Sequence, residues 1–377
     1  MIKRFYFLST KDTNIGDEFI RDGIIAVIHV ILPKNSWEWK VFNKHKPWTF
    51  YPITHPARLA GIIDKFFHGG WHRGLNVLSS LPGNQFFKAD VVIQSGTPII
   101  WENAYRSDWA IPFWKRFASK NMRKIPLLNL GGGSCYPWSD PPERLEGRSK
   151  EFAKTIVHTS TCITVRDPLA AKLLSEASGS DIPTVPCTAF LAGQYHTKIK
   201  NPDGRILFNV MPIGGHFDFL NEINPEAWLT TMKTIIASFQ NEYEIEFICH
   251  NEKEKEFAEK HWPAYLVHYP KNPKDYFTTC AGATVAVVNR LHAAVGLSGL
   301  GIPCIAIGTD TRMLMTRELG ITTLFAPEVT AENLISELQT LLSNRQKLSK
   351  VLLQKRKKVF ENYQTILRHH LIKADDN

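Results

Sequence analysis

The chain has 377 residues, which is too long for one ordinary hydrophobic core and fits two domains. Its 44% hydrophobic and 21% charged residues are normal for a soluble globular protein. The longest apolar run, Ile24 to Leu32, is too short to span a bilayer and predicts a buried helix. The net charge of +9 favours acidic ligands, anionic polymers or an anionic membrane surface, but no nucleic-acid motif accompanies it, and we expect no nucleic-acid partner.

The N-terminal residues and the cysteines indicate the compartment. The basic start at Lys3 and Arg4 is followed by only four apolar residues before Ser9, which predicts no signal peptide. The six cysteines are scattered, mostly in apolar runs, and none has the spacing of a metal site. We interpret them as reduced, mostly buried thiols, and we expect a cytoplasmic protein without a metal or another cofactor.

The first half alternates strands, turns and helices. A strand over residues 2–8 precedes the turn Asn14-Ile15-Gly16-Asp17 and a helix from about Glu18. Residues 34–56 are aromatic and irregular, which predicts a specialised insertion. Three buried strands follow, each ending in a polar or glycine-rich turn: 89–94 before Ser95-Gly96-Thr97, 125–130 before Gly131, Gly132 and Gly133, and 162–165 before Arg166-Asp167. A helix then opens at Pro168, because proline is tolerated in a first turn.

The second half alternates regularly, which is typical of βαβ units and a parallel sheet. Polar passages at 175–183 and 193–204 mark the expected domain boundary. The predicted elements are strands 205–210, 244–250, 265–269 and 283–288 and helices 225–240, 252–262 and 273–281. We predict an N-terminal domain over residues 1–192, a second over 205–340 and a helical segment over 341–377.

The most informative stretch runs from residue 287 to 312. A strand that ends at Arg290 and runs into a helix through His292 presents a cation and a titratable base at a helix N-terminus, where anions are held best. After the helix, a buried strand over 304–308 ends at Thr309-Asp310-Thr311-Arg312. Ligands of open α/β sheets bind at the carboxyl ends of strands, so we expect both clusters to face one ligand.

Each candidate also has a plain structural interpretation. His292 alone would more often be a capping or core histidine, but Arg290 lies two residues earlier and shares its face, and two cations aimed together favour a bound anion. Asp167 before Pro168 is a good N-cap, so the Arg166-Asp167 pair could simply end a strand.

Other polar residues leave the same choice open. The glycines at 131–133 could admit a ligand or form a plain turn, and Asn14 and Asp17 share that ambiguity. His216 and His250 could line a cleft, although each is more simply structural. The basic run 347–358 is either a solvated helix face or a contact with an anionic membrane that holds a lipid-linked sugar.

Together these features resemble the polysaccharide pyruvyl transferase family. The resemblance covers most of the chain, and its landmarks are Asn14-x-Gly16-Asp17, the glycine-rich strand end near 131, Val165-Arg166-Asp167, Arg290-Leu291-His292, Gly301-x-Pro303 and Asp310-x-Arg312. It implies an α/β protein with two Rossmann-like domains facing across a cleft, as in GT-B glycosyltransferases, and C-terminal helices.

The resemblance also implies an activity. Phosphoenolpyruvate would donate a pyruvyl group to a sugar of a glycan precursor, forming a ketal and releasing phosphate. His292 is the implied general acid, and the implied donor-binding residues are Arg166, Arg290, Leu291 and Arg312. The implied acceptor side comprises Asn14, Asp17, Gly131, Gly132 and Gly133.

Departures from the family pattern concern the acceptor more than the donor. Ser95-Gly96-Thr97 stands where the family often has a Gly-Gly pair, and no Asp precedes the Ala189-Phe190 element. Two other functions stay open: a GT-B glycosyltransferase that uses a nucleotide sugar, and a non-catalytic binding protein of the same fold. A Glu near a helix start that binds the donor ribose would favour the first, and the sequence places none next to Arg290.

Overall fold

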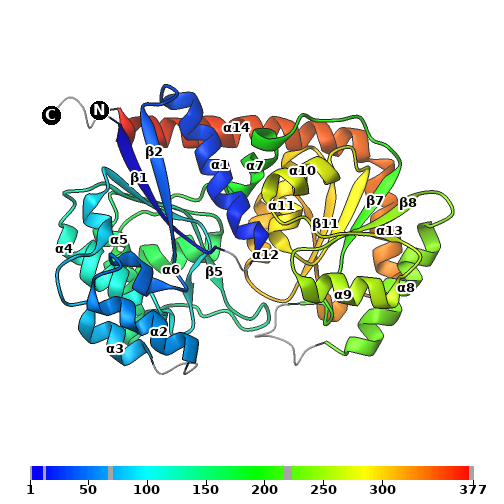
Figure 1. Cartoon of the computed structure of the whole chain (residues 1–377). Helices are drawn as coiled ribbons and strands as arrows, with labels where there is room; N and C mark the ends of the chain where they lie inside the picture. The colour runs from blue at the N-terminus through cyan, green and yellow to red at the C-terminus, as the bar shows by residue number, and fades with distance from the viewer. Residues whose placement is uncertain (1, 12–13, 67–70, 216–222, 373–377) are drawn as a thin grey trace.

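The computed structural model describes residues 2–11, 14–66, 71–215 and 223–372. These residues form two parallel six-stranded β-sheets that lie side by side with helices packed on them (Figure 1). The chain passes from the first sheet to the second between Val165 and Arg205. The predicted α/β class, with two Rossmann-like halves and C-terminal helices, is confirmed.

The first sheet has the order β2-β1-β3-β5-β4, and β6 also pairs with β5. All of these pairings are parallel. The strands are β1 (Lys3–Ser9), β2 (Trp37–Asn43), β3 (Val91–Ser95), β4 (Pro98–Trp101), β5 (Leu127–Cys135) and β6 (Cys162–Val165).

The second sheet has the order β12-β11-β10-β7-β8-β9, again with every pairing parallel. The strands are β7 (Arg205–Asn209), β8 (Glu244–Ile248), β9 (Leu266–His268), β10 (Val285–Val288), β11 (Cys304–Gly308) and β12 (Thr322–Phe325). Each predicted strand of this half is present, with its ends shifted by at most two residues.

Helices connect the strands of both sheets. In the first half they are α1 (Ile15–Ile31), α2 (Leu59–Phe66), α3 (Trp71–Leu78), α4 (Ser119–Asn121), α5 (Gly147–Thr159), α6 (Pro168–Ser178) and α7 (Ala189–His196). In the second half they are α8 (Pro225–Phe239), α9 (Glu252–His261), α10 (Pro273–Cys280), α11 (Leu291–Gly299), α12 (Met313–Glu318), α13 (Ala331–Ser343) and α14 (Arg345–Leu371). Shorter turns of helix cover Pro47–Phe50, Pro56–Arg58, Gln85–Lys88, Ala104–Arg106 and Ala326–Glu328, and a π-helix covers Ala110–Ala118.

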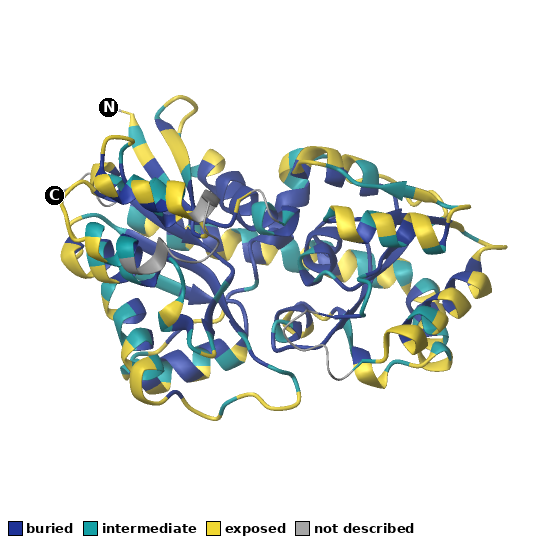
Figure 2. Cartoon of the chain, turned by 60° about the horizontal axis from the view of Figure 1, so that its bottom comes forward, coloured by how far each residue is buried: buried dark blue, intermediate teal, exposed yellow. Residues whose placement is uncertain are grey.

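The central strands are buried on both faces, as parallel sheets require. Every residue of β3, β10 and β11 is buried, and Figure 2 shows the strands in dark blue with exposed yellow faces on the outer helices. This explains why these strands are nearly continuous apolar runs in the sequence. Among the described helices, none is both long and apolar enough to cross a membrane.

Helix α1 lies between the two halves. Its N-cap is Asn14, whose side-chain oxygen accepts a hydrogen bond from the backbone N–H of Gly16 at 3.0 Å. This cap starts the helix at Ile15, three residues earlier than predicted. The helix packs against α7 and α11, and its apolar middle, including Ile24 and Ile28, is buried as predicted. The first turn of α1 therefore points at the second half.

Two sequence predictions in the first half are wrong. Residues 34–56 are not wholly irregular, because β2 (Trp37–Asn43) pairs in parallel with β1 as an edge strand. The glycines at 131–133 do not follow a strand but lie inside β5, which continues to Cys135. The absence of side chains there lets β5 pass close to its neighbours: a Cβ on Gly132 would meet Ile99 at 2.5 Å.

Helix α14 spans both halves along the top of Figure 1. Its Arg356 donates to the backbone oxygen of Gly299 in the second half, at 2.6 Å. Farther along, Tyr363 donates to the backbone oxygen of Pro186 at 3.0 Å, and the backbone oxygen of Leu371 accepts from Lys3 at 2.8 Å. The C-terminal end of α14 therefore lies beside β1, the first strand of the chain.

Candidate active site

A cavity of about 740 Å³ opens between the two sheets, at the carboxyl ends of their strands. Segments that follow β1, β2, β3 and β5 form one side, and segments that follow β10 and β11 form the other. The lining residues are Thr10, Asn14, Asp17, Lys44, His45, Thr97, Pro98, Trp101, Glu102, Trp109, Cys135, Tyr136, Pro137, Arg290, His292 and Arg312.

The structure brings five of the candidates predicted from the sequence to this cavity: Asn14, Asp17, Arg290, His292 and Arg312. Leu291 lines a smaller adjoining cavity of about 30 Å³ that shares Asn14, Arg290, His292 and Arg312 with the larger one. Arg166 and the glycines at 131–133 do not line either cavity.

His292 lies in the first turn of α11, against the first turn of α1. Its Nε2 is 2.9 Å from Nη1 of Arg166, and its Nδ1 is 3.7 Å from Oδ1 of Asp17. Burial, and then repulsion from Arg166 and Arg312, hold the pKa of His292 well below its usual value. Because an arginine can only donate, Nε2 must be the acceptor, so the neutral ring carries its proton on Nδ1, toward Asp17.

Asp17 shares this environment. Burial raises the pKa of its carboxyl group, while the surrounding cations, led by Lys44 and Arg166, act in the opposite direction. A Cβ on Gly16, one residue earlier, would lie 2.8 Å from Cβ of His292. Glycine at this position therefore lets the first turn of α1 approach the histidine closely.

Arg166 is fully buried behind His292. Its Nε and Nη2 have no hydrogen-bond partner among the described residues. Its neighbour Asp167 accepts from the backbone N–H of Ala170 at 2.8 Å and from the hydroxyl of Ser134 at 2.9 Å, which confirms the predicted N-cap. The structure thus separates the pair: Asp167 caps α6, and Arg166 contacts the histidine.

Gly133 makes room for Arg166, and this gives a testable prediction. A Cβ at position 133 would lie 2.5 Å from Nε of Arg166 and 2.9 Å from Oδ2 of Asp167, so Gly133→Ala must displace the arginine. We expect a loss of about 1–3 kcal/mol in the free energy of unfolding, measured by denaturant titration, together with reduced activity. Gly74→Ala in α3 is the control, because nothing lies within 4 Å of its added methyl group. Equal behaviour of the two variants would contradict the assigned role of Gly133.

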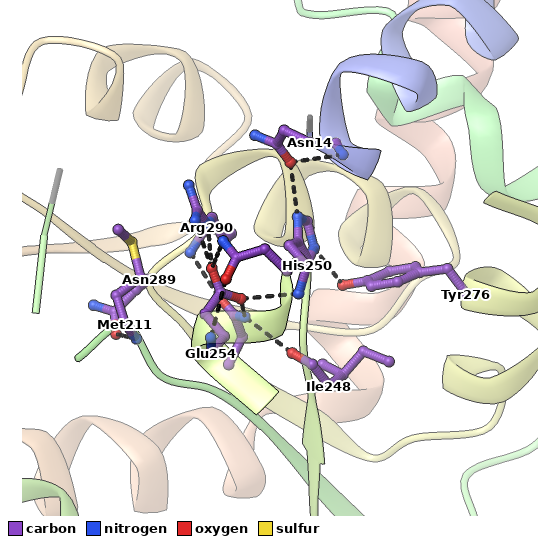
Figure 3. Close-up of polar contacts among 11 residues, drawn as sticks. Asn14, Met211, Ile248, His250, Glu254, Tyr276, Asn289 and Arg290 are labelled. Carbon is purple, nitrogen blue, oxygen red and sulfur yellow. Dashed lines mark hydrogen bonds and ion pairs between the residues drawn. The ribbon is translucent and has the colours of Figure 1, made fainter. Parts of the chain in front are cut away.

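Arg290 is held by a carboxylate that the sequence interpretation missed. Its guanidinium contacts Oε1 of Glu254, in the first turn of α9, at 2.6 Å. The other oxygen of Glu254 accepts from the backbone N–H of His250 at 2.8 Å and from the amide of Asn209 at 2.9 Å (Figure 3). The expectation that no Glu lies near Arg290 is therefore wrong. The fold joins Glu254 and Arg290, although 36 residues separate them in the sequence.

Glu254 and His250 are parts of the same buried cluster. The side chain of Glu254 is 1% exposed, and both of its oxygens are bonded within the protein. His250 contacts Asn14 and the hydroxyl of Tyr276, and burial holds its pKa well below the usual value. It lines the smaller cavity. His216, the other histidine considered from the sequence, lies outside the described residues.

Arg312 pairs with Asp310 through two hydrogen bonds. Its Nε donates to Oδ1 at 2.7 Å, and its Nη2 donates to Oδ2 at 2.6 Å. The same loop is hydrogen-bonded across the cleft to the end of β5. The hydroxyl of Thr311 contacts the hydroxyl of Ser134 at 2.8 Å and accepts from the backbone N–H of Tyr136 at 3.0 Å. These bonds fix the position of Arg312 relative to the first half.

Lys44 is a cation of the cavity that sequence reasoning missed. It follows edge strand β2, and its ammonium donates to the hydroxyl of Thr97 at 3.0 Å and lies 4.7 Å from the ring centre of Trp109. Burial lowers the pKa of Lys44 to about 8. Its only signal in the sequence was its place in the aromatic stretch 34–56.

The cavity therefore combines three cations, Lys44, Arg290 and Arg312, with two histidines, His45 and His292. Such a site suits a small ligand that carries more than one negative charge, because lysine and arginine side chains form charge-assisted hydrogen bonds with anionic oxygens. Among the residues that the structure describes, no group of three or more His, Cys, Asp or Glu is arranged to hold a metal ion.

Two facing Rossmann-like halves with a ligand cavity between them define the GT-B fold. Residues 14–311 match the family described as polysaccharide pyruvyl transferase, and this match covers most of the chain. The chain belongs to the polysaccharide pyruvyl transferase family, as the motifs around Arg166 and Arg290 predicted. No curated protein sequence matches it.

Solved structures support the fold. The chain resembles S. aureus MnaA, solved with UDP, with a TM-score of 0.57, 12% identity and coverage of 98% of this chain and 97% of that one. It also resembles UDP-GlcNAc 2-epimerase from Neisseria meningitidis, bound to UDP-GlcNAc, with a TM-score of 0.57 and 13% identity. That match covers 99% of this chain and 100% of the epimerase. For the α,α-trehalose 6-phosphate synthase from Burkholderia multivorans, the TM-score is 0.54 and the identity 9%. The match covers 100% of this chain and 98% of the synthase. At these identities the likeness concerns the fold.

Proposed function

We propose that the protein transfers a pyruvyl group from phosphoenolpyruvate to a sugar of a glycan precursor, forming a pyruvate ketal and releasing phosphate. The observation that carries the proposal is the convergence of Lys44, Arg290 and Arg312 on one cavity, with His292 among them and Arg166 behind it. Membership of the polysaccharide pyruvyl transferase family supports it independently.

The reaction needs one proton at a specific carbon. Protonating the methylene carbon of phosphoenolpyruvate makes the neighbouring carbon electrophilic. Two hydroxyl groups of the sugar then form two C–O bonds to that carbon, and its bond to the phosphate oxygen breaks. Of the two hydroxyl protons released, one replaces the proton placed on the methylene carbon, and the other leaves with the phosphate. The protein must bind the anion and supply an acid.

His292 is the proposed acid, with Arg290, Arg312 and Lys44 binding the carboxylate and phosphate of the donor. In the free protein the ring is neutral, because burial and the surrounding cations lower its pKa. A bound donor brings negative charge to the same place and offsets that repulsion, which raises the pKa of His292. The acid therefore takes up its proton on Nε2 when the donor binds. Arg166 holds the neutral ring through that nitrogen, and this hydrogen bond must break on protonation, because both groups are then donors.

The direct test is to incubate the protein with phosphoenolpyruvate and a panel of glycans and to follow phosphate release. We expect release that depends on one class of glycan, and a matching gain of a pyruvyl group in the product by mass spectrometry. Calorimetry with phosphoenolpyruvate should show binding. An absence of binding at millimolar phosphoenolpyruvate, with tight binding of a nucleotide sugar, would overturn the proposal.

The affinity for phosphoenolpyruvate should depend on pH through Lys44. In the free protein its ammonium is present below about pH 8 and lost above it. The bound anion raises that pKa, so the association constant should fall as the pH rises above 8, by up to about tenfold per pH unit. Calorimetry between pH 7 and 10 measures this. Lys44→Met should weaken binding and flatten the profile, whereas Lys40→Met, on the outer strand β2, should leave it unchanged. If the association constant of Lys44→Met fell with pH as steeply as that of the wild type, Lys44 would not be the titrating group.

A nucleotide-sugar glycosyltransferase is the second candidate, because MnaA and the Neisseria epimerase were solved with UDP or UDP-GlcNAc. Glu254 lies in the first turn of α9, where a ribose-binding carboxylate would be expected. Its oxygens, however, are already bonded to Arg290, Asn209 and the backbone of His250. Calorimetry with UDP separates the two candidates.

We also propose that the acceptor is presented at the cytoplasmic face of a membrane, held by a lipid carrier. Within the basic run 347–358 of α14, the exposed residues are Lys347, Lys350, Lys357 and Lys358. Lys355 and Arg356, by contrast, are bonded to backbone oxygens of the protein itself. Sedimentation with anionic vesicles should carry the protein down, and charge reversal of Lys357 and Lys358 should prevent it.

A further inference from the structure

One wall of the cavity is formed by the last strand of the first sheet and the segment that follows β5. We name it the β4 wall; it consists of β4, Glu102 and residues 135–137. β3 pairs with β5 as far as Leu130, whereas β4 pairs with the later segment Gly133–Cys135. The β4 wall is therefore an addition to the carboxyl edge of the first sheet. Its second segment meets the loop that carries Arg312, because the backbone oxygen of Tyr136 accepts from the backbone N–H of Thr311 at 2.9 Å.

The backbone at both ends of β4 is in an uncommon conformation. Thr97 has φ 68° and Asn103 has φ 57°, in the left-handed region that favours glycine. Such residues cost free energy and cluster where a structure holds a ligand-binding group in place. Between these two residues, Pro98 and Trp101 of β4 and Glu102 just after it line the cavity.

The side chains of the β4 wall differ in chemistry from the three cations of the cavity, Lys44, Arg290 and Arg312. Trp101 is half-buried and packs against Trp109, with ring centres 5.6 Å apart, while Tyr136 lies farther along the same cavity. Glu102 is exposed and lines the cavity beside Trp101. An aromatic ring next to a carboxylate offers an apolar face and hydrogen-bond acceptors side by side.

We propose that the β4 wall binds one uncharged sugar ring of the acceptor, with Trp101 against its C–H face and Glu102 accepting hydrogen bonds from its hydroxyls. The inference rests on the proposed function and names the acceptor half of the same cavity. A pyranose has an apolar face and a rim of hydroxyls, which is the complement of this pair. The donor does not fit here, because Glu102 repels its carboxylate and phosphate.

The location agrees with the chemistry. Trp109, which packs on Trp101, also contacts the ammonium of Lys44 at 4.7 Å. A ring held at Trp101 is therefore one side chain away from a cation that faces the donor. The same cavity of about 740 Å³ contains both groups and His292.

The test is saturation-transfer NMR with methyl glycosides of neutral hexoses, and with a methyl hexuronide as the acidic counterpart. The wild-type protein should bind at least one neutral glycoside and prefer it to the hexuronide. Trp101→Ala should weaken that binding by about tenfold or more, and Trp101→Phe should restore part of it. Glu102→Ala should also weaken it, whereas Glu102→Gln, which keeps an acceptor oxygen, should bind more tightly than the alanine variant.

Trp39→Ala is the matched control, because Trp39 is an exposed tryptophan of the same half that lines no part of the cavity. It should bind the glycosides as the wild type does. Binding of no neutral glycoside, or unchanged binding in Trp101→Ala, would overturn the inference. Calorimetry with phosphoenolpyruvate on the same samples separates this failure from one of the proposed function, because donor binding should survive in Trp101→Ala.

Discussion

Replacing His292 with Gln is expected to lower turnover by about 10²–10⁴-fold, the usual contribution of a general acid. Donor binding should persist, because Arg290 and Arg312 stay charged and bind the anion whatever the state of the ring. Turnover should fall because the imidazole gives and recovers the proton once the bound donor has raised its pKa. Initial rates of phosphate release, together with calorimetry of phosphoenolpyruvate, measure the two effects separately.

The matched control is His158→Gln, because His158 is an exposed histidine of α5 that lies outside the cavity. This variant should keep wild-type turnover. If His292→Gln retained more than about a tenth of the wild-type rate, above what the loss of a general acid permits, the histidine would be only a helix-start residue. His250 would then be the next acid to test, since it lines the adjoining cavity.

Glu254→Ala is expected to lower the free energy of unfolding by about 3–5 kcal/mol, the cost of removing one partner of a buried ion pair. The loss leaves Arg290 without its carboxylate and takes an acceptor from Asn209 and from the backbone of His250. We also expect weaker donor binding, because Arg290 would no longer be held at the cavity. Denaturant unfolding and calorimetry measure these changes.

Glu252→Ala provides the control on the same helix. Glu252 is 53% exposed and pairs with Lys255 at 3.2 Å at the surface, so its loss should change stability by less than about 0.5 kcal/mol. If the two variants were equally stable, the Glu254 cluster would not hold Arg290 in place. Donor affinity unchanged in Glu254→Ala would show that Arg290 needs no support.

The sequence predicted the second half well, because each βαβ unit there has an uninterrupted apolar strand and a capped helix. Asn251 and Asn272 cap α9 and α10 through their side chains, as expected for Asn before a charged first turn. The first half was harder. Edge strand β2 carries Trp, Glu and Lys in place of an apolar run, since it has a partner on one side only, so its sequence lacks the pattern of a central strand.

Residues that line the cavity can be predicted where a polar side chain follows a strand end in the sequence, as at Arg290, His292 and Arg312. Other residues of the site are missed where the fold joins distant residues. Glu254 lies 36 positions before Arg290, and Lys44 follows a strand that was not recognised. The glycines at 131–133 were assigned to the acceptor because a glycine-rich strand end resembles a ligand turn, but β5 continues through them.

Helix α14 has a consequence for how the protein folds during synthesis. The first sheet leaves the ribosome early, yet α1 packs against α14, and Tyr363 and Leu371 reach the first half only when α14 has been made. Domains usually fold as units in the order of their synthesis. Here the early half lacks part of its covering until α14 has been made, so its stability depends on that helix. Premature termination before α14 would therefore weaken the half that was made first.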